Sequence, residues 1–194
     1  MTLLKYLLLA SVCLYLPAAI AAAAAESKPQ SVQPVPVGKE LLDGTRLILK
    51  QAGCSLELPG AGWRWMTIEK SEKIFLCVNA KFDMLVISTS AMKSEMTAHQ
   101  PESLIKNVRL TTEARGGKIS ADKFELIELP GAKKAAHVSF QEELNGSKKY
   151  AYIYLAQTTD DTLLKLHITA ADKTSEPDEL KKMAQSIKLL SEKK

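Results

Sequence analysis

The sequence predicts an α+β domain with a mostly antiparallel sheet of about six strands. Three observations lead to this prediction. Several short segments rich in apolar residues are separated by glycine, proline or asparagine turns, as in a sheet of short strands. Asn145–Gly146 stands between two of these segments, and this dipeptide is typical of a tight hairpin. Helical periodicity is clear in only two places, near 101–114 and 176–190.

The strands are expected where apolar runs end at turn residues. These segments are 54–58, 73–80, 84–89, 123–129, 135–144, 147–157 and 163–170. Ahead of them, the stretch 37–50 predicts a short helix followed by a short strand. Strands come first, then one helix, then more strands in a meander and finally a terminal helix. This order is typical of an α+β fold with a mostly antiparallel sheet.

Each helix has a recognisable beginning. Pro101 suits a first helical turn, where its missing N–H costs nothing, and Gly116–Gly117 marks the end of that helix. The second helix is expected to start near Ser175, in the pattern Ser-Glu-Pro-Asp of a partial capping box. An apolar stripe follows it, as in a helix that packs on a core: Leu180, Met183, Ala184, Ile187 and Leu190.

Residues 1–25 are expected to be a cleavable signal peptide. Lys5 precedes an apolar run over 6–16, and residues 18–25 are alanine apart from Ile20. The apolar run is short for a bilayer span. Two alternatives stay open: a lipoprotein signal at Cys13, although Val12 fits that motif poorly, and an uncleaved anchor. The expected location is outside the cytoplasm, in the periplasm or secreted.

The remaining chain is expected to be a flexible Pro-rich linker over 26–37 and a single domain over 38–194. No apolar run of membrane length follows the signal, so no membrane span is expected after its removal. The net charge of the full chain is only +4, and its lysine pairs lie between acidic residues. A nucleic-acid partner is therefore not expected, because such proteins concentrate basic residues on one face.

The stretch 53–63, GCSLELPGAGW, resembles the opening of the PsbP-like fold family, which runs glycine, two residues, apolar, any, apolar, proline, two residues and tryptophan; here three residues, 60–62, separate Pro59 from Trp63. The stretch 161–171, with the helix that ends at 185–188, also resembles the end of that fold. Relatives by fold include thylakoid-lumen PsbP proteins, bacterial DcrB, LpqN-type envelope proteins and Mog. The resemblance covers about residues 52–190 and implies an αβα sandwich. It carries no functional residue, because the matched positions are structural.

Cys54 and Cys77 are the two cysteines that follow the signal, and an even pair in an exported protein favours a disulfide. If strands 54–58 and 73–80 pair antiparallel with these residues opposite each other, their Cα atoms would be about 4.5–5.5 Å apart, within disulfide range. The alternative is two separate buried thiols.

Strand registers predict a transverse row of His137, Tyr154 and His167. A two-residue turn at Asn145–Gly146 places His137 opposite Tyr154, and a two-residue turn at Asp160–Asp161 would place Tyr154 opposite His167. Tyr150 and Tyr152 share this face. The histidines would be two strands, roughly 9–10 Å, apart, which is too far for one zinc ion. We therefore expect either a ligand-binding face or an aromatic face packed beneath a helix or the linker.

Trp65 is a second candidate for a binding surface, because it lies beside Arg64 and both residue types are frequent in interface hot spots. The alternative is a tryptophan that covers a sheet edge. Trp63 is expected to fold over the end of the first strand as part of the core.

The sequence contains no nucleophile elbow, phosphate-binding loop or zinc-protease motif. We expect a non-catalytic binding or accessory protein of the cell envelope, with an unidentified protein or small ligand as partner and without a cofactor or metal. Two alternatives remain: a structural accessory subunit of a membrane-associated complex, and an enzyme of unrecognised type.

Overall fold

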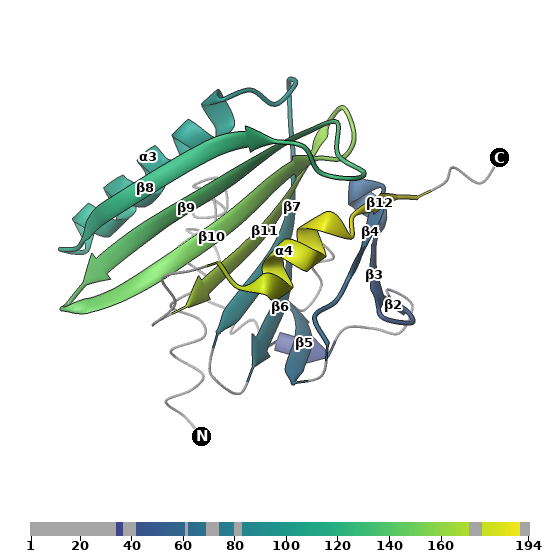
Figure 1. Cartoon of the computed structure of the whole chain (residues 1–194), viewed down its shortest axis with the longest axis horizontal. Coiled ribbons are helices and arrows are strands. Elements are labelled where there is room, and N and C mark those ends of the chain that lie inside the picture. Colours follow the sequence, from purple (N-terminus) through teal and green to yellow (C-terminus); the bar gives the residue numbers. More distant parts are fainter. Residues whose placement is uncertain are drawn as a thin grey trace, which may run out of the picture. The chain divides into compact units, whose positions relative to one another are not determined.

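A computed structural model describes residues 34–36, 42–60, 62–68, 74–79, 83–170 and 176–190. The predicted signal peptide over 1–25 lies outside these residues, as does most of the predicted linker. Within the described residues the strands form two sheets and every strand pair is antiparallel (Figure 1). The α+β class and the antiparallel pairing are therefore confirmed.

The larger sheet has eight strands rather than six. In spatial order they are β1 (Pro34–Pro36), β5 (Trp63–Ile68), β6 (Ile74–Asn79), β7 (Met84–Ala91), β11 (Thr162–Ala170), β10 (Ser147–Gln157), β9 (Lys134–Leu144) and β8 (Lys118–Ile127). The smaller sheet contains β12 (Lys188–Leu189), β4 (Cys54–Glu57), β3 (Arg46–Leu49) and β2 (Leu42–Asp43). A short 3-10 turn, η2 (Lys50–Ala52), connects β3 to β4.

The Asn145 hairpin follows the prediction. Asn145 has φ 52° and Gly146 has φ 74°, as a turn with two left-handed central residues requires. Leu144 consequently pairs with Ser147. His137, seven residues before Leu144 in β9, pairs with Tyr154. The two-residue turn fixes this register, because its length determines which residues of β9 and β10 lie opposite each other.

The turn between β10 and β11 differs from the prediction by one residue. The amide of Thr158 donates to the carbonyl of Thr162 at 3.3 Å, so three residues, 159–161, form the loop instead of two. The hydroxyl of Thr159 donates to the carboxylate of Asp161 at 2.8 Å and helps to close this longer loop. His167 therefore pairs with Ile153 and not with Tyr154.

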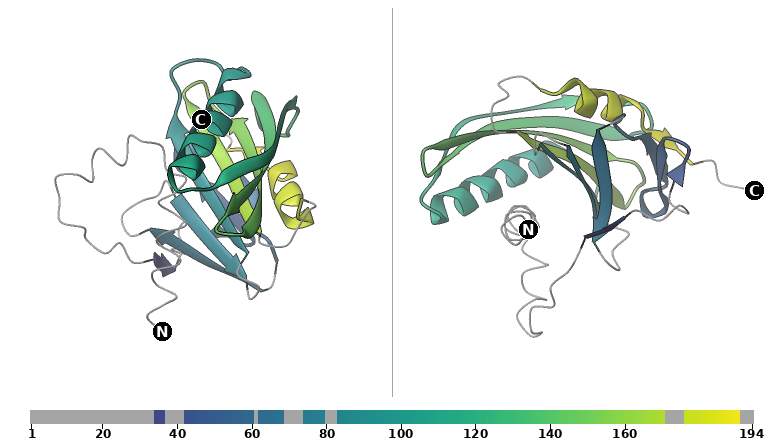
Figure 2. Two further views of the ribbon diagram at one scale, coloured as in Figure 1. Left: turned by 90° about the vertical axis from the view of Figure 1, so that its left-hand side faces the viewer. Right: turned by 90° about the horizontal axis from the view of Figure 1, so that it is seen from below.

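The two helices of the described residues lie on opposite faces of the larger sheet. Figure 2 shows α3 (His99–Ala114) on the concave side of the curved sheet and α4 (Asp178–Gln185) on the other side. α3 packs on β8 and β9, whereas α4 packs on β11 and β4. We call the two sides of the larger sheet the α3 face and the α4 face. The smaller sheet also packs on the α4 face, so this side of the sandwich is more than a helix layer.

α4 is shorter than the predicted helix over 176–190. It ends at Gln185, and Ile187 is 1% exposed in the core. The chain then extends as β12 and pairs with β4. The apolar stripe of the sequence is therefore real, but its last members reach the core from an extended segment, because a strand partner takes over the backbone hydrogen bonds there.

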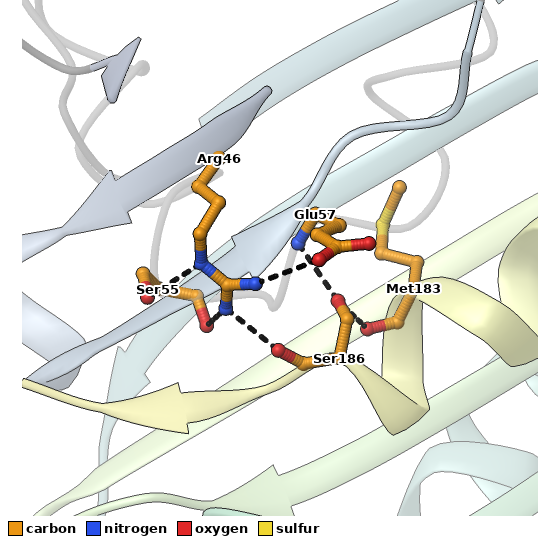
Figure 3. Close-up of polar contacts among 5 residues, drawn as sticks. All are labelled: Arg46, Ser55, Glu57, Met183 and Ser186. Carbon is orange, nitrogen blue, oxygen red and sulfur yellow. Dashed lines mark hydrogen bonds and ion pairs between the residues drawn. The ribbon is translucent and has the colours of Figure 1, made fainter. Parts of the chain in front are cut away.

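Arg46 joins the smaller sheet to the end of α4 (Figure 3). Its guanidinium donates to the carbonyl of Ser186 at 2.7 Å, to the carbonyl of Ser55 at 3.1 Å and to the carboxylate of Glu57 at 3.2 Å. The Ser186 hydroxyl in turn accepts from the Glu57 amide at 2.7 Å. A cation at a helix C-terminus also interacts favourably with the helix dipole, so this contact fixes the trailing end of α4.

The core fills the space between the α4 face, α4 and the smaller sheet. Its fully buried side chains come from both sheets and from the helix: Leu47, Leu56, Phe75, Leu85, Ile87, Leu164, Leu166, Ile168, Leu180 and Met183. Gly131, at φ 67°, approaches this region closely, since a Cβ there would lie 2.8 Å from the carbonyl oxygen of Ile187.

The predicted pairing of Cys54 with Cys77 is wrong. Cys54 lies in β4, which pairs with β3 and β12, whereas Cys77 lies in β6 and pairs with Trp65 and Leu85. Both cysteines are free thiols and both are 0% exposed in the shared core. The structure thus has the alternative arrangement, two buried thiols that pack as small apolar side chains.

We expect both thiols to be unreactive in the folded protein. Burial raises the pKa of each thiol to about 12, and the thiolate is the reactive form. A thiol-specific chromogenic reagent, applied without reductant at pH 8, is expected to label neither Cys54 nor Cys77 until denaturant is added, and then to label both. Labelling of neither cysteine after unfolding would instead indicate a disulfide.

Candidate functional site

The tyrosine face is largely packed into the protein. Tyr152 is 8% exposed and Tyr154 is 6% exposed, and both belong to the core beneath α4, while Tyr150 packs against its margin. Their hydroxyl-bearing rings are therefore mostly covered by the helix layer, as the second of the two expectations for this face described. At the β8–β10 end of the face, near Tyr150, Ser139 and Gln141 are partly exposed polar residues.

Trp65 lies on the same α4 face. The segment that carries it is a strand, β5, which the sequence interpretation missed. Trp63 and Trp65 are two residues apart in this strand, so they point to the same side, and both pack half-buried against the core. Trp65 therefore contributes to packing at the β5 end of the sheet, and Arg64 between them points the other way.

His137 is the centre of a titratable cluster on the α4 face. Its ring lies 4.8 Å from that of Tyr154, measured between centroids. Its Nδ1 is 3.7 Å from the carboxylate of Glu125 on β8, and its Nε2 is 3.7 Å from the carboxylate of Glu176, which precedes α4. Burial, reinforced by the Glu176 carboxylate, raises the pKa of Tyr154, so this phenol is a neutral donor.

This cluster does not have the form of a metal site. The two carboxylates approach opposite nitrogens of the imidazole, so one ion cannot contact the ring and both acids together. Among the residues that the structure describes, no group of three or more His, Cys, Asp or Glu side chains is arranged to hold a metal ion.

His167 lies on the α3 face, away from the tyrosines. On this face it is flanked by Ile153 of β10 and Val86 of β7, and Leu76 of β6 follows in the same row. His167 is 1% exposed, and its Nε2 lies 3.1 Å from the hydroxyl of Thr169. The three-residue loop is the cause of this placement, because a shift of one residue moves every side chain to the other face.

Lys165 stands beside His167 on the same face of β11. Its row contains Leu155 of β10, Ser88 of β7 and Ile74 of β6. Leu155 is 2% exposed and Ile74 is 8% exposed. The side chain of Lys165 therefore leaves the strand among apolar neighbours. We call Lys165, His167, Ser88 and Thr169 the polar quartet of the α3 face.

Burial controls the electrostatics of the quartet. Desolvation lowers the pKa of Lys165. Desolvation, followed by the charge of Lys165, lowers the pKa of His167 to about 3, so this imidazole is neutral throughout the physiological range. His167 is buried and Lys165 is partly exposed on this largely apolar sheet face, and a lysine charge in such surroundings costs free energy.

Lys165 was absent from the sequence-based candidates. A local signal existed, since Lys165 and His167 alternate with Leu164, Leu166 and Ile168 in one strand. In a strand covered on both faces, the residues between core positions are also buried. The pattern therefore predicts a lysine among apolar neighbours once the strand is known to be central in its sheet, and Lys165 is partly exposed there.

The comparisons with known proteins concern the fold. No family model and no curated protein match the chain. A crystal structure from Bacteroides thetaiotaomicron VPI-5482 is 14% identical, with a TM-score of 0.52. The match covers 79% of this chain and 51% of the Bacteroides chain, so this chain spans about half the length of that one. A structure of LpqN, involved in cell envelope biogenesis of Mycobacterium tuberculosis, is 15% identical over 80% of this chain and 88% of that chain, with a TM-score of 0.48.

The likeness to the Bacteroides structure shows the fold alone. No family model supports the PsbP-like resemblance of the sequence, so the family assignment stays a prediction. Among the described residues, no helix combines the length and apolar character that crossing a membrane requires.

Proposed function

We propose that this chain is an exported, non-catalytic binding protein of the cell envelope, and that it binds an amphiphile with an acidic head group on the α3 face. The observation that carries the proposal is the position of Lys165 and His167 among apolar side chains in the middle of this face. The α4 face is a weaker candidate, because its tyrosines are engaged in the core.

The chemistry of the quartet favours an anion. A buried ammonium is stabilised when a negative charge lies beside it, and a charge-assisted hydrogen bond to a carboxylate is roughly twice as strong as a neutral one. The Ser88 hydroxyl in the same row, together with neutral His167 and the Thr169 hydroxyl, supplies further hydrogen-bonding groups. Lys165 and His167 both have other interacting groups in the structure, so the proposal rests on their location and not on an unpaired charge.

The surroundings of the quartet favour an apolar chain attached to that anion. Ile74 and Leu76 of β6 and Ile153 and Leu155 of β10 continue the same rows, and all four are under 9% exposed. Aliphatic side chains of this kind bind methylene groups, at about 0.8 kcal/mol for each buried CH₂. α3 lies along the other half of the face, over β8 and β9.

A displacement assay with the purified protein tests this function. A fluorescent long-chain carboxylic acid is the probe, and an alcohol of the same chain length is the neutral competitor. We expect the acid to bind and Lys165→Met to weaken that binding about tenfold, while Lys165→Arg retains most of it. Lys123→Met, at an exposed lysine of β8, is the matched control and should leave binding unchanged.

Two results would contradict the proposal. One is the absence of saturable binding of the acid by the wild-type protein. The other is equal binding of the acid and the alcohol by both wild type and Lys165→Met, which would indicate apolar adsorption without recognition of the charge.

A further inference from the structure

The leading end of α4 is held to the larger sheet by the cluster around His137. Glu176 precedes Pro177, which is the N-cap residue of α4 and is buried. The Glu176 side chain is 21% exposed, that of His137 is 17% exposed and that of Glu125 is 47% exposed. His137 therefore sits between a partly buried carboxylate of the helix segment and a more exposed one of β8.

The polar atoms of this contact are incompletely satisfied. His137 Nε2 and Glu176 Oε1 are both buried and have no hydrogen-bond partner among the residues that the structure describes. The two nitrogen–carboxylate distances of 3.7 Å are within ion-pair range and slightly beyond hydrogen-bond range. A buried polar atom without a partner costs free energy, so a state that pairs these atoms is favoured over one that does not.

The charge of His137 decides whether the contact attracts. A neutral imidazole carries one N–H, so one of its nitrogens presents a lone pair to a carboxylate in either tautomer. The imidazolium carries two N–H groups and one positive charge, and it attracts Glu125 and Glu176 together. We propose that His137, Glu125 and Glu176 form a pH-sensitive clasp, which holds the start of α4 on the sheet more firmly when His137 is protonated.

The other groups that face His137 leave this sign unchanged. Tyr154, on β10, is a neutral phenol beside the ring. Lys123, on β8, lies 3.3 Å from the Glu125 carboxylate and compensates part of its charge. Glu176, with the greater burial, is therefore the stronger partner, and the clasp acts mainly between the sheet and the helix segment.

The opposite end of α4 lacks this sensitivity. There the Arg46 guanidinium donates to the Ser186 carbonyl, and an arginine keeps its charge at any physiological pH. One end of the helix is consequently fixed at all pH values, while the attachment of the other depends on the charge of His137. Loosening is expected to begin at Glu176 and to proceed toward Leu180.

Amide hydrogen exchange at pH 5.5 and 7.5, corrected for intrinsic rates, tests the clasp in the whole protein. The readout is the protection of α4 relative to β10, which cancels changes in global stability. We expect relative protection to be about two- to fivefold higher at pH 5.5, since partly exposed ion pairs contribute modestly. Glu176→Gln is expected to abolish the difference, and His137→Gln serves as a second, independent variant.

Glu179→Gln is the matched control, because Glu179 is an exposed acid in the first turn of the same helix. It should behave as the wild type. The proposal is overturned if the wild type shows no pH-dependent change in relative protection, if Glu176→Gln keeps the wild-type change, or if Glu179→Gln removes it equally. The last result would assign the effect to the helix dipole.

Discussion

Leu180→Ala is expected to lower the free energy of unfolding by about 3 kcal/mol, within the range found for leucines deleted from packed cores. Leu180 is 0% exposed and is part of the core that α4 closes against β11 and β4. Removing its side chain leaves a cavity whose walls belong to two sheets, and such walls cannot easily collapse together. Urea unfolding followed by circular dichroism measures the change.

Leu110→Ala is the control for this experiment. Leu110 has the same side chain on the outer surface of α3, where it is 56% exposed. We expect a change within about 0.5 kcal/mol, as for surface substitutions in general. Equal destabilisation by both variants would mean that α4 does not cover the core in the way described.

Acidification from pH 7.5 to 5.0 is expected to lower the free energy of unfolding by about 2 kcal/mol through His167 alone. The folded-state pKa of His167 is about 3, whereas an unfolded histidine titrates near pH 6.5. Below pH 6.5 the unfolded chain therefore binds a proton that the folded chain excludes. The stability is fully present above that pH and decreases as the pH falls toward 3.

His167→Gln tests the assignment, because glutamine can still hydrogen-bond to Thr169 but does not titrate. The variant is expected to lose less than about 0.5 kcal/mol between pH 7.5 and 5.0. His99→Gln, at an exposed histidine in the first turn of α3, should keep the full wild-type loss. A wild-type loss that survives in His167→Gln would show that another group causes the acid sensitivity.

The sequence predicted correctly those parts of the fold that depend on neighbouring residues alone, such as the Asn145–Gly146 turn. Asn145–Gly146 prescribes its turn type, so the register of β9 and β10 could be obtained from the sequence alone. The turn at Asp160–Asp161 has no such restriction. Its polar residues are equally suitable for two- or three-residue loops. Thr159, the additional loop residue, donates a side-chain hydrogen bond to Asp161.

Sheet membership could not be read from a strand's own residues. The strand that begins at Cys54 has the apolar pattern of a sheet interior, but its partners, β3 and β12, lie in a second sheet. β12 itself is contained within what periodicity describes as a helix. Which strands pair is decided by the whole core, and the pairing error of Cys54 with Cys77 follows directly from this.

The candidate site changed for a related reason. The tyrosines and His137 do share one face, as the hairpin register requires, but the sequence could not show that α4 and a second sheet cover it. His167 moved to the other face with the three-residue loop. Lys165 could be recognised as a candidate only from the structure, in which β11 lies between β7 and β10 and has apolar neighbours on both faces.

The two separated cysteines have a consequence for how the chain matures. Because neither thiol closes a loop, the native fold is reached without an oxidation step and needs neither an oxidase nor an isomerase of disulfides. The same polypeptide should therefore acquire its native structure in a reducing compartment as readily as in an oxidising one, and its yield should be indifferent to the redox buffer used for refolding.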